Sequence, residues 1–398
     1  MSGYRSLHRE KVGDYPIWHV VSSPLLSTKP LSSMGKPSMP SWRIWAACGD
    51  GFVRGFLVRE KSLETQPDVL DASAATCVCT HLLIGKSQAI TNDNNNHQKY
   101  LGCSQVQLVR NYVGDDDRAG DVVVVSIDLT GRIRIWSLPE SMDDDGDVNE
   151  SSRDVKPQQV AATIEFVVEN ATGTSFQICP PRISGVGDVL LAVARLDGTV
   201  AVVATGLATP NAPKPALAAG TMVDVWSKPG SIAMTSDWHP SKRCVAVGRQ
   251  DGLVEILGEA PHRLIHHQAP VRAVRFTPDA TLLITASDDG MLAIWDLCRS
   301  VPVLVNHLVD AHASWILNMA KLDDSRRFVT CGADHRLHVW RVGQLHQALH
   351  TFTCDDTVWT IHATMPQQRS LISGGSTPPR LISGSESGHL QIYSLESS

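Results

Sequence analysis

Two segments near the carboxyl end of the chain carry the same four residue types at the same intervals. The first set is His267, Thr285, Asp289 and Trp295, and the second is His312, Thr330, Asp334 and Trp340. In both sets the steps along the chain are 18, 4 and 6 positions. This double coincidence indicates a structural repeat, so we expect the chain to build similar units in series.

Short apolar runs rich in Val, Ile and Leu recur along the chain in pairs, and each pair is joined by a tight turn that often contains Asp-Gly. The turns that we compare lie at Asp50, Asp128, Asp197, Asp251, Asp289, Asp334 and Glu386. The better-formed turns are 38 and 45 residues apart, close to the repeat of about 40 to 45 residues in propeller blades. Helical periodicity is almost absent. The sequence therefore predicts an all-β, seven-bladed β-propeller with loop insertions.

We expect one domain over residues 1–398, built from blades of four antiparallel strands with the first strand innermost. The predicted blades cover approximately 14–58, 71–138, 160–205, 225–258, 264–298, 308–343 and 350–395. Insertions with polar or Pro-rich composition, expected as mobile surface loops, lie near 27–41, 59–100, 139–157, 206–220 and 366–380. Residues 4–8 are predicted to complete the outer strand of the last blade and so to close the ring.

The repeated His, Thr, Asp and Trp side chains predict a buried hydrogen-bonded tetrad in each of two blades. A buried imidazole needs partners for both ring nitrogens, and an indole N–H, a hydroxyl and a carboxylate in sequence around it supply them. We therefore interpret each tetrad as a staple between a loop and its sheet. A hydroxyl, an imidazole and a carboxylate could also serve a hydrolase, but repetition in two blades favours the structural role.

Composition narrows the classes of partner and compartment. With a formal net charge of -6 and no basic run, the chain is not expected to bind nucleic acid or an anionic membrane directly. No apolar stretch has the length of a secretory signal or a membrane span, so we expect an intracellular protein. The 9 cysteines lack paired spacing, which is typical of free thiols in a reducing compartment.

The sequence predicts neither a metal site nor a cofactor. Several Cys and His residues lie near one another in sequence but lack C-x-x-C or H-E-x-x-H spacing. These residues are Cys77, Cys79, His262, His266, His267, His335, His338, His346 and His350. A phosphate-binding glycine loop and a dinucleotide fingerprint are also missing from the sequence. No motif therefore indicates an enzyme.

The stretches PVRAVRFTPDATLLITASDDGMLAIWDL and DAHASWILNMAKLDDSRRFVTCGADHRLHVW, followed by DDTVWTI and LQIY, resemble the WD-repeat family. More narrowly, they look like the WD-repeat subunit of the superkiller (Ski) complex, which in animals also occurs in the polymerase-associated factor (Paf) complex. The close resemblance covers about residues 225–361. Departures from the family pattern are Thr130 and Ser387 at expected Asp positions, and Val247 and Leu257 at expected Thr and Trp positions.

This resemblance implies a non-catalytic scaffold that uses no cofactor. The family's propeller binds a helical-repeat scaffold subunit that also carries an RNA helicase, and the Ski complex feeds messenger RNA to the exosome for decay from the 3' end. The implied partners are therefore these two proteins and Paf-complex subunits, and the implied locations are the cytoplasm and the nucleus. An alternative is a substrate receptor of a cullin-type ubiquitin ligase, although the run from Trp295 to Arg299 has one residue more than the W-D-x-R docking signature.

Partner binding is expected at the narrow end of the ring, where the inner strands begin. Offsets from His267 and His312 in blades five and six, and alignment of the apolar residue that follows in other blades, place a set of aromatic and polar side chains on this top face. The set is Trp18, Phe176, Ile232, Met234, Gln250, Pro270, Arg272, Asp288, Trp315, Leu317 and Trp359. Trp and Arg dominate interface hot spots, which favours a protein-binding face. The alternative is that several of these side chains pack against the next blade, as we expect for Trp136, Trp295 and Trp340 in the core.

Overall fold

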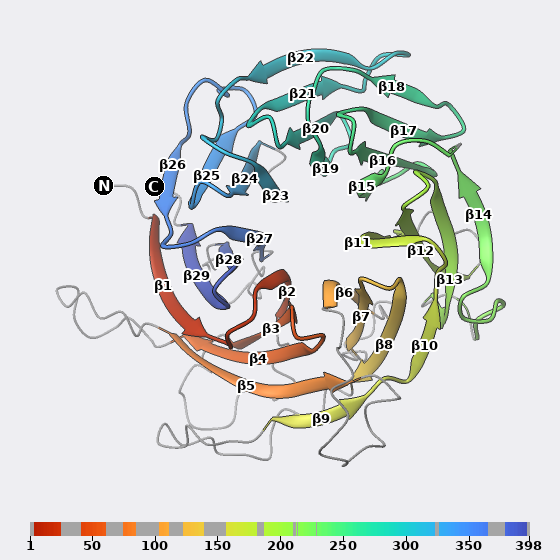
Figure 1. Cartoon of the computed structure of the whole chain (residues 1–398), viewed down its shortest axis with the longest axis vertical. Coiled ribbons are helices and arrows are strands. Elements are labelled where there is room, and N and C mark those ends of the chain that lie inside the picture. Colours follow the sequence, from red (N-terminus) through yellow and green to blue (C-terminus); the bar gives the residue numbers. More distant parts are fainter. Residues whose placement is uncertain are drawn as a thin grey trace, which may run out of the picture.

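Seven sheets stand in a ring around a central axis (Figure 1). The structure is a computed structural model. It describes residues 4–24, 41–60, 75–84, 103–110, 122–138, 157–180, 187–209, 212, 214–227, 229–322, 326–364 and 379–395. Within these ranges every regular element is a strand, so the predicted all-β, seven-bladed propeller is confirmed. The described residues include no helix long and apolar enough to cross a membrane.

The first three blades come from the amino-terminal half of the chain. Blade one contains β2 (Ile17–Pro24), β3 (Ser41–Cys48), β4 (Val53–Glu60) and β5 (Ala75–Ile84), with β9 (Gln158–Ala161) added parallel to β5. Blade two contains β6 (Cys103–Arg110), β7 (Val122–Asp128), β8 (Arg132–Leu138) and β10 (Ile164–Val167). Blade three contains β11 (Ala171–Ile178), β12 (Asp188–Arg195), β13 (Val200–Ala208) and β14 (Met222–Trp226).

The other four blades follow in chain order. Blade four contains β15 (Ala233–Trp238), β16 (Cys244–Arg249), β17 (Val254–Gly258) and β18 (His262–Leu264). Blade five contains β19 (Val271–Phe276), β20 (Leu282–Ser287), β21 (Leu292–Asp296) and β22 (Val303–Leu308). Blade six contains β23 (Ile316–Lys321), β24 (Arg327–Gly332), β25 (Arg336–Arg341) and β26 (His350–Thr353). Blade seven contains β27 (Val358–Ala363), β28 (Arg380–Ser385), β29 (His389–Leu395) and β1 (Tyr4–Lys11).

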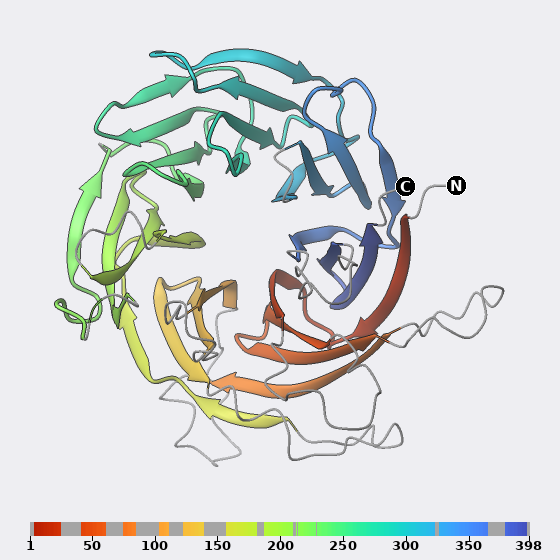
Figure 2. The ribbon, with the colours of Figure 1, turned by 180° about the vertical axis from the view of Figure 1, so that it is seen from behind.

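Both ends of the described chain meet in blade seven. Strand β1 pairs antiparallel with β29, from Tyr4 opposite Leu395 to Lys11 opposite His389. The view from behind shows the same closure, with the red first strand beside the blue last blade (Figure 2). The amino-terminal residues therefore form the outer strand of the last blade, as the sequence predicts, so that β29 is paired on both sides and the two ends of the chain close the ring.

The observed blades differ from the predicted boundaries mainly at their outer strands. Strand β5 lies inside the predicted insertion 59–100 and is an outer strand of blade one, because it pairs with β4 from Val53 to Glu60. The predicted limits 264–298 and 308–343 omit β22 and β26, which pair with the third strands of their blades. Most of the predicted insertions near 27–41, 59–100, 139–157 and 366–380 lie outside the described residues.

Neighbouring blades pack through apolar side chains of their sheets. Trp295 of blade five lies in a buried cluster with residues of blade four such as Ile256, and Trp340 of blade six lies in a cluster with Ile284 of blade five. Trp136 is also fully buried. These three third-strand tryptophans therefore belong to the core between or within blades, as we expected, and each aromatic side chain buries about 150 to 250 Å².

The inner edges of the sheets are capped by side chains from the preceding blade. Gln105 Oε1 accepts a hydrogen bond from the N–H of Phe176 at 2.7 Å, which links blades two and three. Thr360 Oγ1 accepts one from the N–H of Val20 at 3.4 Å, which links blades seven and one. An inner strand has no further strand to pair with, so these side chains satisfy main-chain groups that would otherwise lack partners.

Candidate protein-binding face

Blade five contains the first predicted tetrad with its hydrogen bonds in the expected order. His267 Nδ1 lies 3.2 Å from Asp289 Oδ2, and His267 Nε2 lies 2.8 Å from Thr285 Oγ1. The indole N–H of Trp295 donates to the same hydroxyl at 3.4 Å. Asp289 also accepts a hydrogen bond from the main-chain N–H of Gln268 at 3.1 Å. The tetrad thus ties the loop that leads into the blade to the turn between β20 and β21.

The tetrad of blade six is tighter. His312 Nδ1 lies 2.9 Å from Asp334 Oδ1, and His312 Nε2 lies 2.7 Å from Thr330 Oγ1. The indole N–H of Trp340 donates to Thr330 Oγ1 at 2.8 Å. Burial raises the pKa of Asp334, but the hydrogen bond and charge of His312 outweigh it and leave that pKa below its usual value. Thr285 and Thr330 are fully buried, so neither hydroxyl is accessible to a substrate, which argues against the hydrolase alternative at the tetrads.

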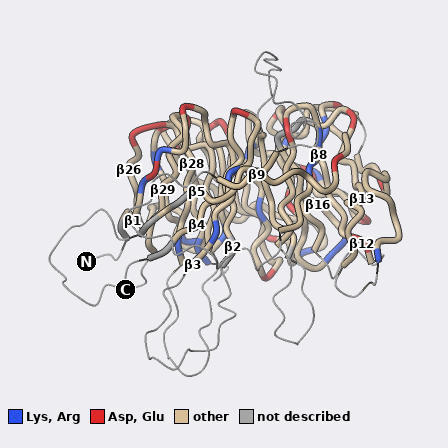
Figure 3. Tube along the Cα trace, turned by 90° about the horizontal axis from the view of Figure 1, so that it is seen from below, with Lys and Arg blue, Asp and Glu red and all other residues tan. Residues whose placement is uncertain are grey.

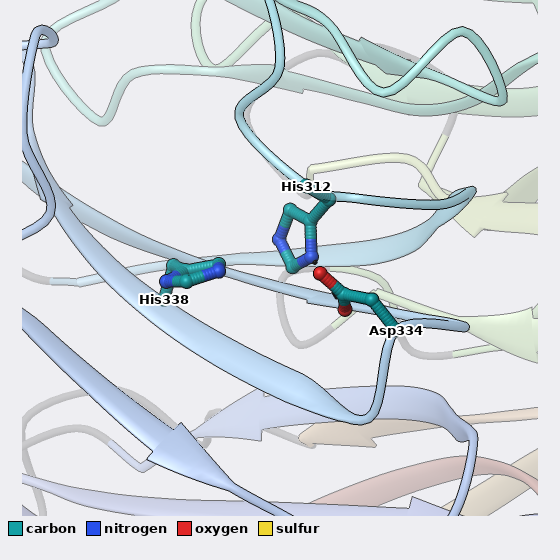
Figure 4. Close-up of side chains that lie close together, drawn as sticks. All are labelled: His312, Asp334 and His338. Carbon is teal, nitrogen blue, oxygen red and sulfur yellow. Dashed lines mark hydrogen bonds and ion pairs between the residues drawn. The ribbon is translucent and has the colours of Figure 1, made fainter.

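His338 lies beside this second tetrad (Figure 4). Its ring centroid is 4.5 Å from that of His312, and one ligand atom each from His312, Asp334 and His338 lie within 4.8 Å of one another. Such a group has the donor types of a metal site. However, both nitrogens of His312 are engaged in the tetrad, and His338 Nδ1 lies 2.8 Å from Thr351 Oγ1. A metal ion would have to break these hydrogen bonds, so we interpret the group as part of the staple.

The top face is formed by the start of each inner strand and the turn between the second and third strands. One main-chain hydrogen bond joins these two parts in successive blades, from Gln250 N–H to Ile232 O at 3.0 Å and from Asp288 N–H to Pro270 O at 2.9 Å. In blade six the N–H of Ala333 donates to Trp315 O at 3.0 Å. Ile232, Pro270 and Trp315 therefore occupy equivalent places around the ring.

Three of the predicted top-face residues form one cluster across blades five and six. Trp315 is 52% exposed. The guanidinium carbon of Arg272 lies 5.7 Å from the centre of the Trp315 ring, a cation–π distance. Arg272 Nε is held in turn by Asp288 Oδ1 at 2.7 Å. Arg272, held by Asp288, thus lies against the indole of Trp315 while the indole stays exposed to solvent.

Blade seven repeats this arrangement with different residues. Trp359 has the place of Arg272 on its inner strand, Glu386 has the place of Asp288 in its turn, and the indole N–H of Trp359 donates to the Glu386 carboxylate. Trp18 is the corresponding residue of blade one. Trp18, Ile232, Met234, Pro270 and Trp359 are partly exposed, and Gln250 is exposed. These predicted residues do lie at the rim.

Two predicted top-face residues are wrong. Phe176 is fully buried and pairs with Val193, so it matches Val274 of blade five, which is a core position. The β-bulge of β11, from Ala171 to Phe176, has two more residues than the equivalent stretch of β19 from Val271 to Val274. The sequence alignment missed this longer bulge. Leu317 has the same place as Arg272, but its side chain is buried.

Three exposed apolar side chains of the rim were missed by sequence reasoning. Leu129 and Leu196 are 41% and 52% exposed, and both are the second residue of their turns, the position of Asp288 in blade five. Tyr15 is 51% exposed and precedes the start of β2. The constant place in the turn could have revealed the two leucines. The top face therefore carries apolar side chains in several blades.

Carboxylates accompany these apolar side chains. Every turn between second and third strands contains at least one Asp or Glu, and the side view shows acidic segments gathered along one rim of the ring (Figure 3).

Blade four lacks a tetrad, and Arg249 holds its turn instead. Arg249 donates to Gly198 O at 2.8 Å and to Ser231 O at 2.7 Å, and it pairs with Glu255. This arginine staple was not predicted.

Comparison with known proteins agrees with this geometry. The model of the WD domain, G-beta repeat, matches residues 258–296 and 303–341, which hold most of blades five and six. The chain is 30% identical over 135 residues to the WD repeat-containing protein WDS homolog of Arabidopsis thaliana, and this covers 33% of the chain and 25% of that protein. It is 35% identical over 72 residues to the meiotic recombination protein rec14 of Schizosaccharomyces pombe, covering 17% and 24%.

A third relative is the pre-rRNA-processing protein IPI3 of Yarrowia lipolytica, 40% identical over 70 residues, which cover 17% of the chain and 16% of that protein. The matched segments thus span a quarter or less of these relatives. Their names are diverse, and none of the three names a Ski or Paf subunit. The two matched repeats and the seven-bladed ring are consistent with a WD40-repeat propeller.

Proposed function

We propose that this propeller is a non-catalytic scaffold whose top face binds a protein partner. The observation that carries the proposal is the exposed indole of Trp315 stacked on Arg272, which Asp288 holds by an ion pair. A rigid, exposed aromatic side chain loses little conformational entropy on binding, and Trp and Arg are enriched at interface hot spots. WD-repeat propellers are generally scaffolds of this kind.

The finer part of the proposal concerns the partner. The resemblance of residues 225–361 to the WD-repeat subunit of the Ski complex favours a helical-repeat scaffold subunit as the direct partner, with an RNA helicase in the same assembly. In this proposal the chain supports exosome-linked decay of messenger RNA in the cytoplasm and joins Paf-complex subunits in the nucleus. The segment that carries the resemblance includes Arg272, Asp288 and Trp315, so partner binding and resemblance concern the same part of the ring.

The test is affinity purification of the tagged chain from its own cells, followed by mass spectrometry. Wild type is compared with a Trp315→Ala/Trp359→Ala variant and with Val301→Ala, in which an exposed apolar side chain is removed from the loop between β21 and β22, at the end of blade five opposite the top face. Thermal unfolding of all three proteins is measured first. Because both tryptophans lie at the rim, we expect the variants to fold with little change in stability.

Loss of the same protein partners from the double variant, but not from Val301→Ala, would support the top-face site. Recovery of a helical-repeat protein with an RNA helicase would support the Ski assignment. Recovery of cullin-ligase components would replace that assignment by the receptor alternative. Equal recovery of all partners by wild type and the double variant would contradict binding at the top face.

A further inference from the structure

Inner strands of four neighbouring blades bring basic side chains together at the axis of the ring. Strands β19, β23, β27 and β2 pack beside one another in this order. Arg275 lies opposite Ile284, and His362 lies opposite Ile382. Each isoleucine comes five residues before the third residue of the following turn, so Arg275 and His362 have the same register position in their blades. His19 lies one layer nearer the top face, at the level of Asn318. The four side chains therefore come from four blades and two adjacent layers.

Hydrogen bonds connect Arg275 to the neighbourhood of His19. The Arg275 guanidinium donates through Nη2 to Asn318 Oδ1 at 3.3 Å, and through Nη1 to the carbonyl oxygen of Val274 at 2.7 Å. Asn318 Nδ2 donates to Thr360 Oγ1 at 3.5 Å, and the same hydroxyl accepts from the N–H of Val20 at 3.4 Å. Because Val20 follows His19 in the chain, this network reaches across three blade boundaries.

Within the described part of the chain, Arg275 has no ion-pair partner. Its two hydrogen bonds go to neutral oxygens, although a guanidinium carries five N–H donors. Asp237, on the neighbouring inner strand of blade four, is paired with Lys321 at 3.3 Å and accepts the N–H of Phe276. The two hydrogen bonds of Arg275 thus use two of its five N–H donors, and neither bond goes to a carboxylate.

His19 supplies a second, independent observation. Its Nδ1 atom is buried without a hydrogen-bond partner among the described residues, an arrangement that costs free energy. Burial, and then the nearby His362 and Arg275, lower the pKa of His19 to about 3. The three groups thus lie close enough to repel one another's positive charge, and a negative charge between them would relieve this repulsion.

We propose that the axis of the propeller binds one small oxyanion between Arg275 and His19, with His362 beside it. The guanidinium fork matches the oxygens of phosphate or carboxylate, and a ring of donors from several blades suits a tetrahedral anion best. The shared chemistry is that of an oxyanion, whose source is either a phosphate group or a carboxylate. This site is separate from the top-face cluster, so it does not depend on the proposed partner.

Isothermal titration calorimetry with inorganic phosphate tests the proposal, at constant ionic strength balanced with sodium chloride. We expect one phosphate per wild-type chain and binding at least about tenfold weaker in Arg275→Gln, since an Arg–oxyanion contact contributes about 1.5 to 3 kcal/mol. The matched control is Arg299→Gln, an exposed arginine of the same blade. A parallel titration with acetate distinguishes the sources, because binding as tight as that of phosphate would indicate a carboxylate ligand.

Absence of binding heat in wild type up to millimolar anion would overturn the proposal, as would equal affinity in wild type and Arg275→Gln. In case Arg275→Gln does not fold, a second measurement uses the wild type alone. The imidazole ¹⁵N signal of His19 is followed in a long-range ¹H–¹⁵N spectrum during the phosphate titration, with His19→Gln used only to assign it. A saturable shift of this signal is the expected result, and an unchanged signal would contradict anion binding beside His19.

Discussion

Asp237 on the inner strand of blade four holds the main chain of Phe276 on the inner strand of blade five. Its Oδ2 atom accepts the hydrogen bond from the Phe276 N–H at 2.9 Å. The same atom lies 3.3 Å from Lys321 Nζ in blade six, so one carboxylate connects three blades. Contacts of this type couple neighbouring blades, because separating blades four and five would leave the main-chain N–H of Phe276 without its acceptor.

Asp237→Ala should therefore destabilise the propeller. The buried N–H of Phe276 would lose its acceptor, which costs about 1 to 3 kcal/mol in the free energy of unfolding. Urea unfolding followed by circular dichroism measures the loss. Glu259→Ala is the control, since this carboxylate is exposed, and its effect should stay within about 0.5 kcal/mol. Equal effects of the two substitutions would contradict the role of Asp237.

The two tetrads should differ in their contribution to stability. Thr330→Val and Thr285→Val keep the side-chain shape but remove the hydroxyl that meets a buried imidazole and a buried indole N–H. Each change should cost about 1 to 3 kcal/mol. The cost should be larger for Thr330, because the Trp340 N–H lies 2.8 Å from its hydroxyl against 3.4 Å for Trp295 and Thr285.

The stability, partner binding and hydrolytic activity of the Thr330→Val variant distinguish the staple from the hydrolase alternative. If the tetrad is a staple, Thr330→Val lowers the unfolding temperature and the folded fraction still binds its partners. A variant with unchanged stability that has lost a measurable hydrolytic activity would speak for catalysis instead.

The stability of the protein should fall as the pH drops from about 6.5 to about 4. Burial, and then the neighbouring His312, lower the pKa of His338 from 6.5 to about 4. In this window the unfolded chain binds a proton that the folded chain does not, so protons favour unfolding. Denaturant unfolding at about pH 7 and about pH 5 measures the difference. His338→Gln should make it smaller, and an unchanged difference would contradict the assignment to His338.

His335 is a site where a glycine should stabilise the protein. It has a φ of 63° at the turn position where Gly51 and Gly290 have φ values of 88° and 74°. A left-handed conformation costs a non-glycine residue about 1 to 2 kcal/mol, partly offset by the extra entropy of glycine in the unfolded chain. His335→Gly should thus raise the free energy of unfolding by about 0.5 kcal/mol.

The matched opposite change is Gly388→Ala in blade seven. Gly388 has a φ of 78° at the same turn position, and an added Cβ would meet the carbonyl oxygen of Gly13. This substitution should destabilise the protein by at least about 1 kcal/mol. Thermal unfolding in one buffer checks both changes, and a shift of the same sign in both would show that backbone conformation is not the cause.

Much of the ring was determined by the sequence alone. The tetrad positions and the turn residues can be predicted from local spacing. His267 and Asp289 belong to the same blade, and the four tetrad residues recur at fixed intervals in the next blade. The closing strand at residues 4–8 also follows, since a propeller must pair its last sheet. Trp315 and Arg272 could be placed at the rim because their offsets from the tetrad histidines are short and uninterrupted.

Only the tertiary structure decided features that depend on segments far apart in the sequence. Phe176 was placed at the rim until the lengthened bulge before it showed that it pairs with Val193 in the core. Arg249 reaches a carbonyl of the preceding blade, and the charge of Arg275 lowers the pKa of His19 although 256 residues separate them in the sequence. Local patterns determine which residues enter a strand, but closure of the ring decides which strands become neighbours, and with them which charges face each other.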